Sequence, residues 1–90
     1  MKSYILSPVP QAVGREVLNA LLPGQTDPWV IWASRGGALA YFNVMESEDV
    51  EGEWWVQADI SGRHYNRDAD VIALLEEVRK VTGGEIIYSP

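Results

Sequence analysis

The chain has 90 residues, which suits one compact domain spanning residues 1–90, because chains of this size hold a single hydrophobic core. Apolar residues make up 47% of the chain and charged residues 22%, a globular mixture that excludes a disordered protein. Thirteen acidic and seven basic residues give a net charge of −6, the wrong sign for binding nucleic acid or an anionic membrane surface.

Residues 1–24 predict a strand, a turn and a helix. Ser3 to Leu6 is a short β-prone run, and the following Ser7-Pro8-Val9-Pro10 forces a turn that pre-sets φ for a helix. From Pro10 to Leu22 the apolar residues follow helical spacing, and a Pro-Gly pair ends the run. Gly14 is the weak point of this helix, at a cost of up to about 1 kcal/mol relative to alanine.

The same segment bears on localisation. Only one basic residue, Lys2, precedes a three-residue apolar run, which is far too short for a signal peptide or a membrane span. We therefore expect a cytoplasmic protein.

The next part of the chain predicts a β-hairpin. Two β-prone runs, residues 29–35 and 38–45, flank Gly36-Gly37, a pair that supplies the positive φ of a tight two-residue turn. This turn places Trp32 opposite Tyr41. One face of the hairpin then carries Trp29, Ile31, Ala33, Ala40, Phe42 and Val44. The other face carries Val30, Trp32, Ser34, Leu39, Tyr41 and Asn43.

An acidic loop and a third strand follow. Residues 46–53 hold five acidic residues and no basic one, which is typical of an exposed loop. Residues 53–60 then alternate, so that Trp54, Val56, Ala58 and Ile60 share one face of a strand. Pairing across the loop places Val44 opposite Trp54 and Phe42 opposite Val56, which joins the apolar faces into one sheet surface.

The last third predicts a helix and a closing strand. Asp68 or Asn66 can cap the start of the helix, and Gly83 can take the left-handed position at its end. Residues 85–88 then form the closing strand. The apolar residues of the helix recur at amphipathic spacing: Val71, Leu74, Leu75, Val78 and Val81.

The resulting order, β-α-β-β-β-α-β, predicts an α+β fold. A single-layer, mainly antiparallel sheet would carry both helices on one face. The order resembles that of ferredoxin-like sandwiches with an extra strand.

The sheet face opposite the helices is the first candidate surface. It would expose Trp32, Tyr41 and Trp55, more aromatic area than a protein leaves in water without a reason. Tyrosine and tryptophan dominate interface hot spots, so we expect a protein-binding face, with a homodimer as one form of it. A covering loop, or cross-strand pairing for stability alone, would explain the same residues.

The acidic loop is the second candidate. Its spacing lacks the EF-hand pattern of alternating ligands with a terminal glutamate, so we expect no metal there. Such a run is either a solvated loop or a surface that steers a basic partner into contact. The expected partner-binding residues are Glu46, Glu48, Asp49, Glu51 and Glu53 together with Trp32, Tyr41 and Trp55.

The polar segment of residues 59–68 is the third candidate, because it carries the single histidine. As an active site it would use His64 as general acid or base, oriented by Asp59 or Asp68, with Arg63 or Arg67 holding an anion. Helix capping and arginine–carboxylate pairing explain the same residues. The chain has no cysteine and no nucleophile-elbow motif, so no other catalytic group is expected.

Two functions remain open. The first is a small acidic module that binds and neutralises or escorts a basic protein. In size, charge and class it is similar to the immunity or antitoxin-type inhibitors of bacteria, and it needs no cofactor. The alternative is a small dimeric enzyme with an acid–base site around His64.

Overall fold

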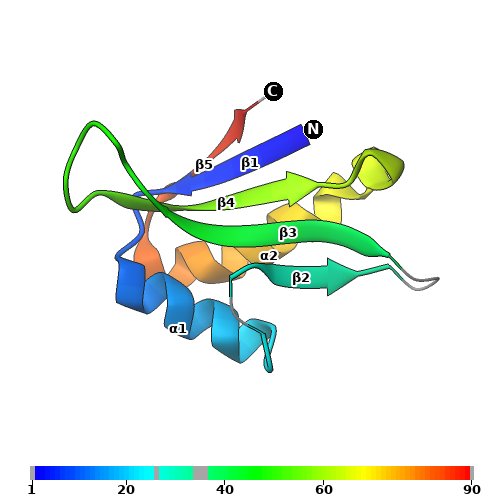
Figure 1. Cartoon of the computed structure of the whole chain (residues 1–90), viewed down its shortest axis with the longest axis horizontal. Coiled ribbons are helices and arrows are strands. Elements are labelled where there is room, and N and C mark those ends of the chain that lie inside the picture. Colours follow the sequence, from blue (N-terminus) through cyan, green and yellow to red (C-terminus); the bar gives the residue numbers. More distant parts are fainter. Residues whose placement is uncertain (1, 26, 34–36, 90) are drawn as a thin grey trace.

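The computed structural model describes residues 2–25, 27–33 and 37–89, except for the side chains of Arg63, Tyr65 and Ser89 (Figure 1). The elements follow the order that the sequence predicted, with a short 3-10 helix added before the second α-helix. They are β1 (Lys2–Ser7), α1 (Gln11–Leu21), β2 (Trp29–Trp32), β3 (Ala38–Glu46), β4 (Trp54–Ile60), η1 (Gly62–Arg67), α2 (Asp68–Thr82) and β5 (Glu85–Ser89).

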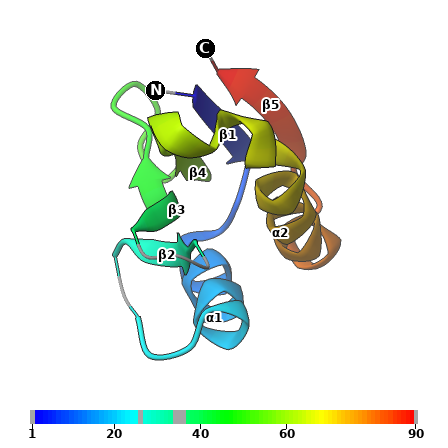
Figure 2. The ribbon, with the colours of Figure 1, turned by 90° about the vertical axis from the view of Figure 1, so that its right-hand side faces the viewer.

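The five strands form one open antiparallel sheet in the order β2-β3-β4-β1-β5. Both helices pack on the same face of it, which confirms the predicted α+β fold (Figure 2). With β2 set aside, the elements follow the β-α-β-β-α-β order of the ferredoxin-like fold, so β2 is the extra strand. The sequence left the strand order open, and the structure makes β2 and β5 the edges.

The register of the hairpin differs from the prediction. Tyr41 lies opposite Val30 and not opposite Trp32, because β2 ends at Trp32 and Ala33 already belongs to the connection. The Ala33 amide donates to the Gly37 carbonyl oxygen at 3.1 Å. The predicted two-residue turn is therefore wrong, while the predicted pairing of residues 34 and 35 lies outside the described residues.

The β3–β4 register is also shifted by two residues. Val44 lies opposite Val56 and not Trp54, because β3 continues to Glu46, which pairs with Trp54. A shift of two leaves every side chain on its predicted face, since side chains alternate with a period of two. The predicted inner face is therefore correct although the predicted partners are wrong.

The core lies between this inner face and the helices. Trp29 is fully buried, and its indole nitrogen donates to the Asn19 side chain of α1 at 2.9 Å. Leu39 was predicted on the opposite, open face, yet it is only 2% exposed. Its carbonyl oxygen accepts from the Ser61 amide, and η1 contacts β3 beside it. Other fully buried residues are Leu6, Leu18, Phe42, Val56, Ile60, Val71, Leu75 and Val78.

Helix α1 approaches the sheet closely at Gly14. A Cβ atom added there would lie 2.8 Å from Val9 Cγ1 and 3.7 Å from methyl groups of Val44 and Val56. The glycine predicted as a weak point of the helix is thus the position at which the helix backbone meets the sheet.

The ends of α2 were predicted in part. Gly83 follows the helix with φ of 77°, the left-handed conformation expected of it. At the other end Arg67 takes the N-cap position with no side-chain capping bond, so the predicted cap by Asn66 or Asp68 is wrong. Asp68 instead begins the helix, with its carboxylate turned toward β1. No helix in the described part of the chain is long and apolar enough to cross a membrane.

Candidate partner-binding surface

The acidic loop, residues 46–53, joins β3 to β4 at one end of the sheet (Figure 1). It folds on itself: the Ser47 amide donates to the Glu53 carbonyl oxygen at 2.7 Å, and the Ser47 hydroxyl accepts from the amides of Asp49 and Val50. These bonds use the backbone, so the carboxylates of the loop point into solvent and are exposed. Over the described residues, no group of three or more acidic or histidine side chains could hold a metal ion.

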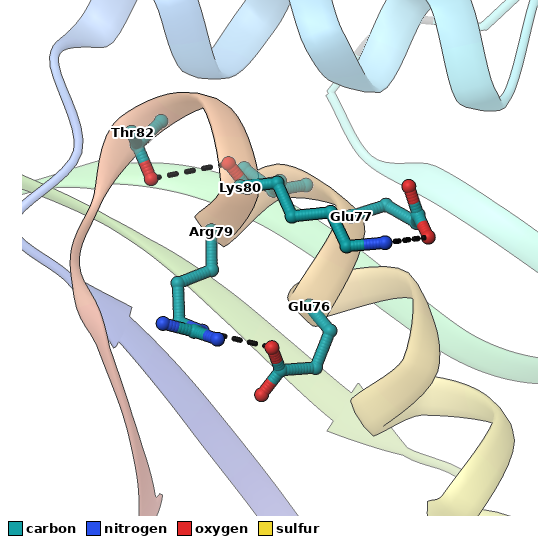
Figure 3. A network of polar contacts seen from close by, with 6 residues as sticks. Glu76, Glu77, Arg79, Lys80 and Thr82 are labelled. Atoms are coloured by element: carbon teal, nitrogen blue, oxygen red, sulfur yellow. Dashed lines mark hydrogen bonds and ion pairs between the residues drawn. The ribbon is translucent and has the colours of Figure 1, made fainter.

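The basic side chains that the structure describes form ion pairs away from the acidic loop. Each of the five whose positions are described pairs with a carboxylate outside the acidic loop: Lys2–Asp68, Arg15–Asp27, Arg67–Asp70, Arg79–Glu76 and Lys80–Glu77. Figure 3 shows the last two pairs, each of which joins residues three positions apart near the C-terminal end of α2. The acidic loop makes no ion pair with any of these five described bases, so they do not compensate its negative charge.

A groove of about 480 Å³ lies between the acidic loop and the turn that joins β1 to α1. The Val9 amide of that turn donates to the Trp54 carbonyl oxygen at 2.9 Å, which holds the two walls together. Glu51 and Glu53 line the groove from the loop side. The apolar part of the lining comes from Pro8, Pro10, Val50 and Trp54. We call the groove formed by these residues and the two glutamates the loop groove.

The open face of the sheet carries a chain of polar contacts along β4. The Trp55 indole nitrogen lies 3.4 Å from the Gln57 oxygen, and the Gln57 nitrogen donates to Asp59 at 3.1 Å. Ser3 of β1 donates to the same Asp59 oxygen at 2.5 Å. Apolar side chains flank this chain on both sides: Tyr41 and Met45 on β3, with exposures of 37% and 39%, and Ile87 on β5, with 52%.

Two of the aromatic residues predicted to form one binding face, Trp32 and Trp55, lie beside opposite ends of β3. Trp55 pairs with Met45 next to the acidic loop, whereas Trp32 pairs with Ala38 beyond a bulge at the opposite end of β3. Eight residue steps along β3 separate these ends, roughly 26 Å at ~3.3 Å per residue. Trp32 is 64% exposed. A contact centred on the acidic loop therefore includes Trp55 and leaves Trp32 at its far margin.

The predicted acid–base residues are also separated. Asp59 bonds to Ser3 on the open face, while Asp68 accepts from Lys2 at 2.8 Å and from the Tyr4 hydroxyl at 2.9 Å. Successive residues of β1 point to opposite sides of the sheet, so the two carboxylates lie on opposite sides of it. The structure thus does not bring Asp59 and Asp68 together around His64, which is partly buried, and the Arg63 side chain lies outside the description.

In the Lys2–Tyr4–Asp68 cluster, one carboxylate of α2 accepts hydrogen bonds from two side chains of β1. The hydrogen bond from Lys2, and then that from Tyr4, holds the pKa of Asp68 below its ordinary value of 3.8. Burial, followed by the bond to Asp68, raises the pKa of Tyr4 above 10.0, and the same carboxylate raises the pKa of Lys2 above 10.5. A neutral tyrosine and a charged Lys2–Asp68 pair thus join β1 to the start of α2.

Three residues of the loop groove, Pro8, Pro10 and Trp54, were not predicted as part of a binding surface. The sequence placed Trp54 on the inner apolar face and the two prolines in a turn, which are correct local descriptions. The available signal was that Trp54 directly follows the last glutamate of the loop. Only the packing of the β1–α1 turn against the start of β4 shows that these segments face one another.

Comparison of the chain with models of known families, with curated proteins and with solved structures gave no match.

Proposed function

We propose that this protein is a small binding module that attaches to a basic partner protein and neutralises or escorts it, as an inhibitor or immunity-type protein does. The observation that carries the proposal is the distribution of charge. The described bases are all paired outside the acidic loop, so the loop presents a negative surface without internal compensation. Such a surface attracts a positive partner and raises the association rate.

The open face of the sheet supports the same function by offering contact area beside the loop. Met45 and Trp55 form a cross-strand pair there, and Tyr41 lies further along β3. Aromatic and methionine side chains are enriched where protein interfaces are buried. A second copy of the chain is a poorer occupant, because two surfaces of the same negative sign repel one another.

The proposal is tested with the wild-type protein and a charge-reversed variant, Glu48→Lys with Glu51→Lys, as baits in a lysate of the source organism. Each substitution changes the charge by two units, so the net charge moves from −6 to −2. A basic protein captured by the wild type is then purified, and its association rate is measured at low and high salt. We expect the rate to fall at least about tenfold in the variant at low salt.

Two results would contradict the proposal. One is that no basic protein is enriched on the wild-type bait relative to the variant. The other is that the purified partner associates with both proteins at the same rate and with the same salt dependence. Circular dichroism of the variant shows whether its fold is retained.

A further inference from the structure

The loop groove gives the proposed binding function a specific recognition element. Its volume of about 480 Å³ lies in the range of roughly 300–1,000 Å³ found for ligand pockets, so it is large enough for a long side chain. Two prolines, a valine and a tryptophan form its walls, and two glutamates line it from the loop side. Val50 is 51% exposed, so this wall is accessible from solvent.

A lining of this kind fits a side chain with an apolar stem and a positive end. Lysine and arginine have this form, since their methylene groups cover apolar surface while the charged group reaches polar partners. Arginine fits better for two reasons. Its planar guanidinium stacks on an aromatic ring, as Trp54 offers, and it binds a carboxylate through two parallel hydrogen bonds, as Glu51 or Glu53 offers.

We infer that the loop groove receives an arginine side chain of the basic partner, stacked against Trp54 and paired with Glu51 or Glu53. The inference rests on the proposed function and goes beyond it by naming the residue of the partner that is recognised. The groove is formed without a ligand, because the Val9–Trp54 and Ser47–Glu53 backbone bonds fix its two sides. A preformed site loses little entropy when the side chain enters.

The first experiment compares two short glycine–serine peptides of equal charge, one with two arginines and one with two lysines. Each is titrated into the ¹⁵N-labelled protein, and the indole N–H signal of Trp54, assigned with Trp54→Phe, is followed by NMR. We expect the arginine peptide to shift this signal and to bind about fivefold more tightly than the lysine peptide.

The second experiment uses two double variants that remove the same charge from the same loop. Glu51→Gln with Glu53→Gln alters the groove, whereas Glu46→Gln with Glu48→Gln alters carboxylates that do not line it. For the arginine peptide we expect the Kd to rise about tenfold in the first variant and less than about threefold in the second. Val50→Ser, which changes no charge, is expected to raise the Kd about threefold by making the wall polar.

Equal weakening in both double variants would show that the peptide senses only net charge, and this would overturn the inference. The same holds if the Trp54 signal does not move, or if lysine and arginine peptides bind alike. In those cases the proposed function still stands if the purified basic partner associates in the salt-dependent manner described above. Loss of that association as well would mean that the proposed function itself is wrong.

Discussion

Single residues of this protein are constrained most tightly where backbones approach one another. Gly84, directly before β5, is buried, and a Cβ atom there would lie 2.8 Å from the Pro8 carbonyl oxygen and 2.9 Å from the Ser7 backbone. Neither contact is with a movable side chain. Ser7 also pairs with Glu85, so a shift of this backbone would disturb the β1–β5 ladder. The sequence predicted the left-handed conformation of the preceding Gly83 but gave no sign of the close approach at Gly84.

Gly84→Ala is therefore expected to lower the free energy of unfolding by about 2–3 kcal/mol, since the added methyl group collides with backbone. Gly62→Ala is the matched control, because no atom lies within 4 Å of a Cβ at that position. We expect the control to change stability by less than about 0.5 kcal/mol. Urea denaturation of the three proteins measures both effects, and equal stability of the two variants would contradict the close approach.

At the scale of elements, periodicity predicted the helices and strands well and the pairing between them less well. Val71, Leu75 and Val78 of α2 are fully buried, as the helical repeat predicts. Val81, the last residue of the predicted apolar set, is 61% exposed because it lies at the end of the helix. Both hairpin registers were shifted by two residues, and by three at Trp32 beyond the bulge, because strand and loop lengths depend on where the last ladder hydrogen bond forms. Away from the bulge the predicted face of each side chain was correct, since it depends only on parity.

A charge placed on the buried side of α2 tests its packing. Val78→Asp should lower the free energy of unfolding by at least about 3 kcal/mol, because an unpaired carboxylate would enter the core. Val81→Asp makes the same change on the same helix at a side chain that is 61% exposed, and there we expect less than about 1 kcal/mol. Thermal or urea unfolding compares the two. A well-folded Val78→Asp protein with wild-type stability would show that α2 does not pack through this face.

At the scale of the whole molecule, charge is arranged in two ways. Ion pairs on the helices and at the β1–α2 junction balance bases with acids locally, and the acidic loop at one end of the sheet keeps an unbalanced excess. The Lys2–Asp68 contact spans 66 positions of sequence and Tyr4–Asp68 spans 64, so this cluster joins the first strand to the last helix. Its titration therefore affects the stability of the whole chain.

The pH dependence of unfolding follows from the directions of these pKa shifts. Asp68 has a pKa below 3.8 in the folded protein, so its contribution is fully present above pH 3.8 and is lost as the pH falls through the lowered value. Lys2 has a pKa above 10.5, so its contribution is present below pH 10.5 and is lost as the pH rises through the raised value. We expect stability to decline at both ends of this window.

The variant Asp68→Asn should lose part of the decline in stability at acid pH. Between neutral pH and a pH below 3.8, the free energy of unfolding of this variant is expected to fall less than that of the wild type, as measured by urea denaturation. Asp70→Asn, which removes an exposed ion pair with Arg67, is the control and should keep the wild-type slope. An unchanged acid limb in Asp68→Asn would show that this cluster does not couple pH to stability.

The amino-acid sequence by itself determined the type and order of the strands and α-helices, the inner face of the sheet and the position of the acidic loop. These features depend on local repeats, turns and charge runs, each of which is determined by residues close together in the sequence. Only the tertiary structure decided the strand order, the registers, the separation of Asp59 from Asp68 and the groove that sets the β1–α1 turn opposite the acidic loop. Each of these features depends on contacts between segments far apart in sequence. Packing between elements, and not local preference, determines which of these segments meet.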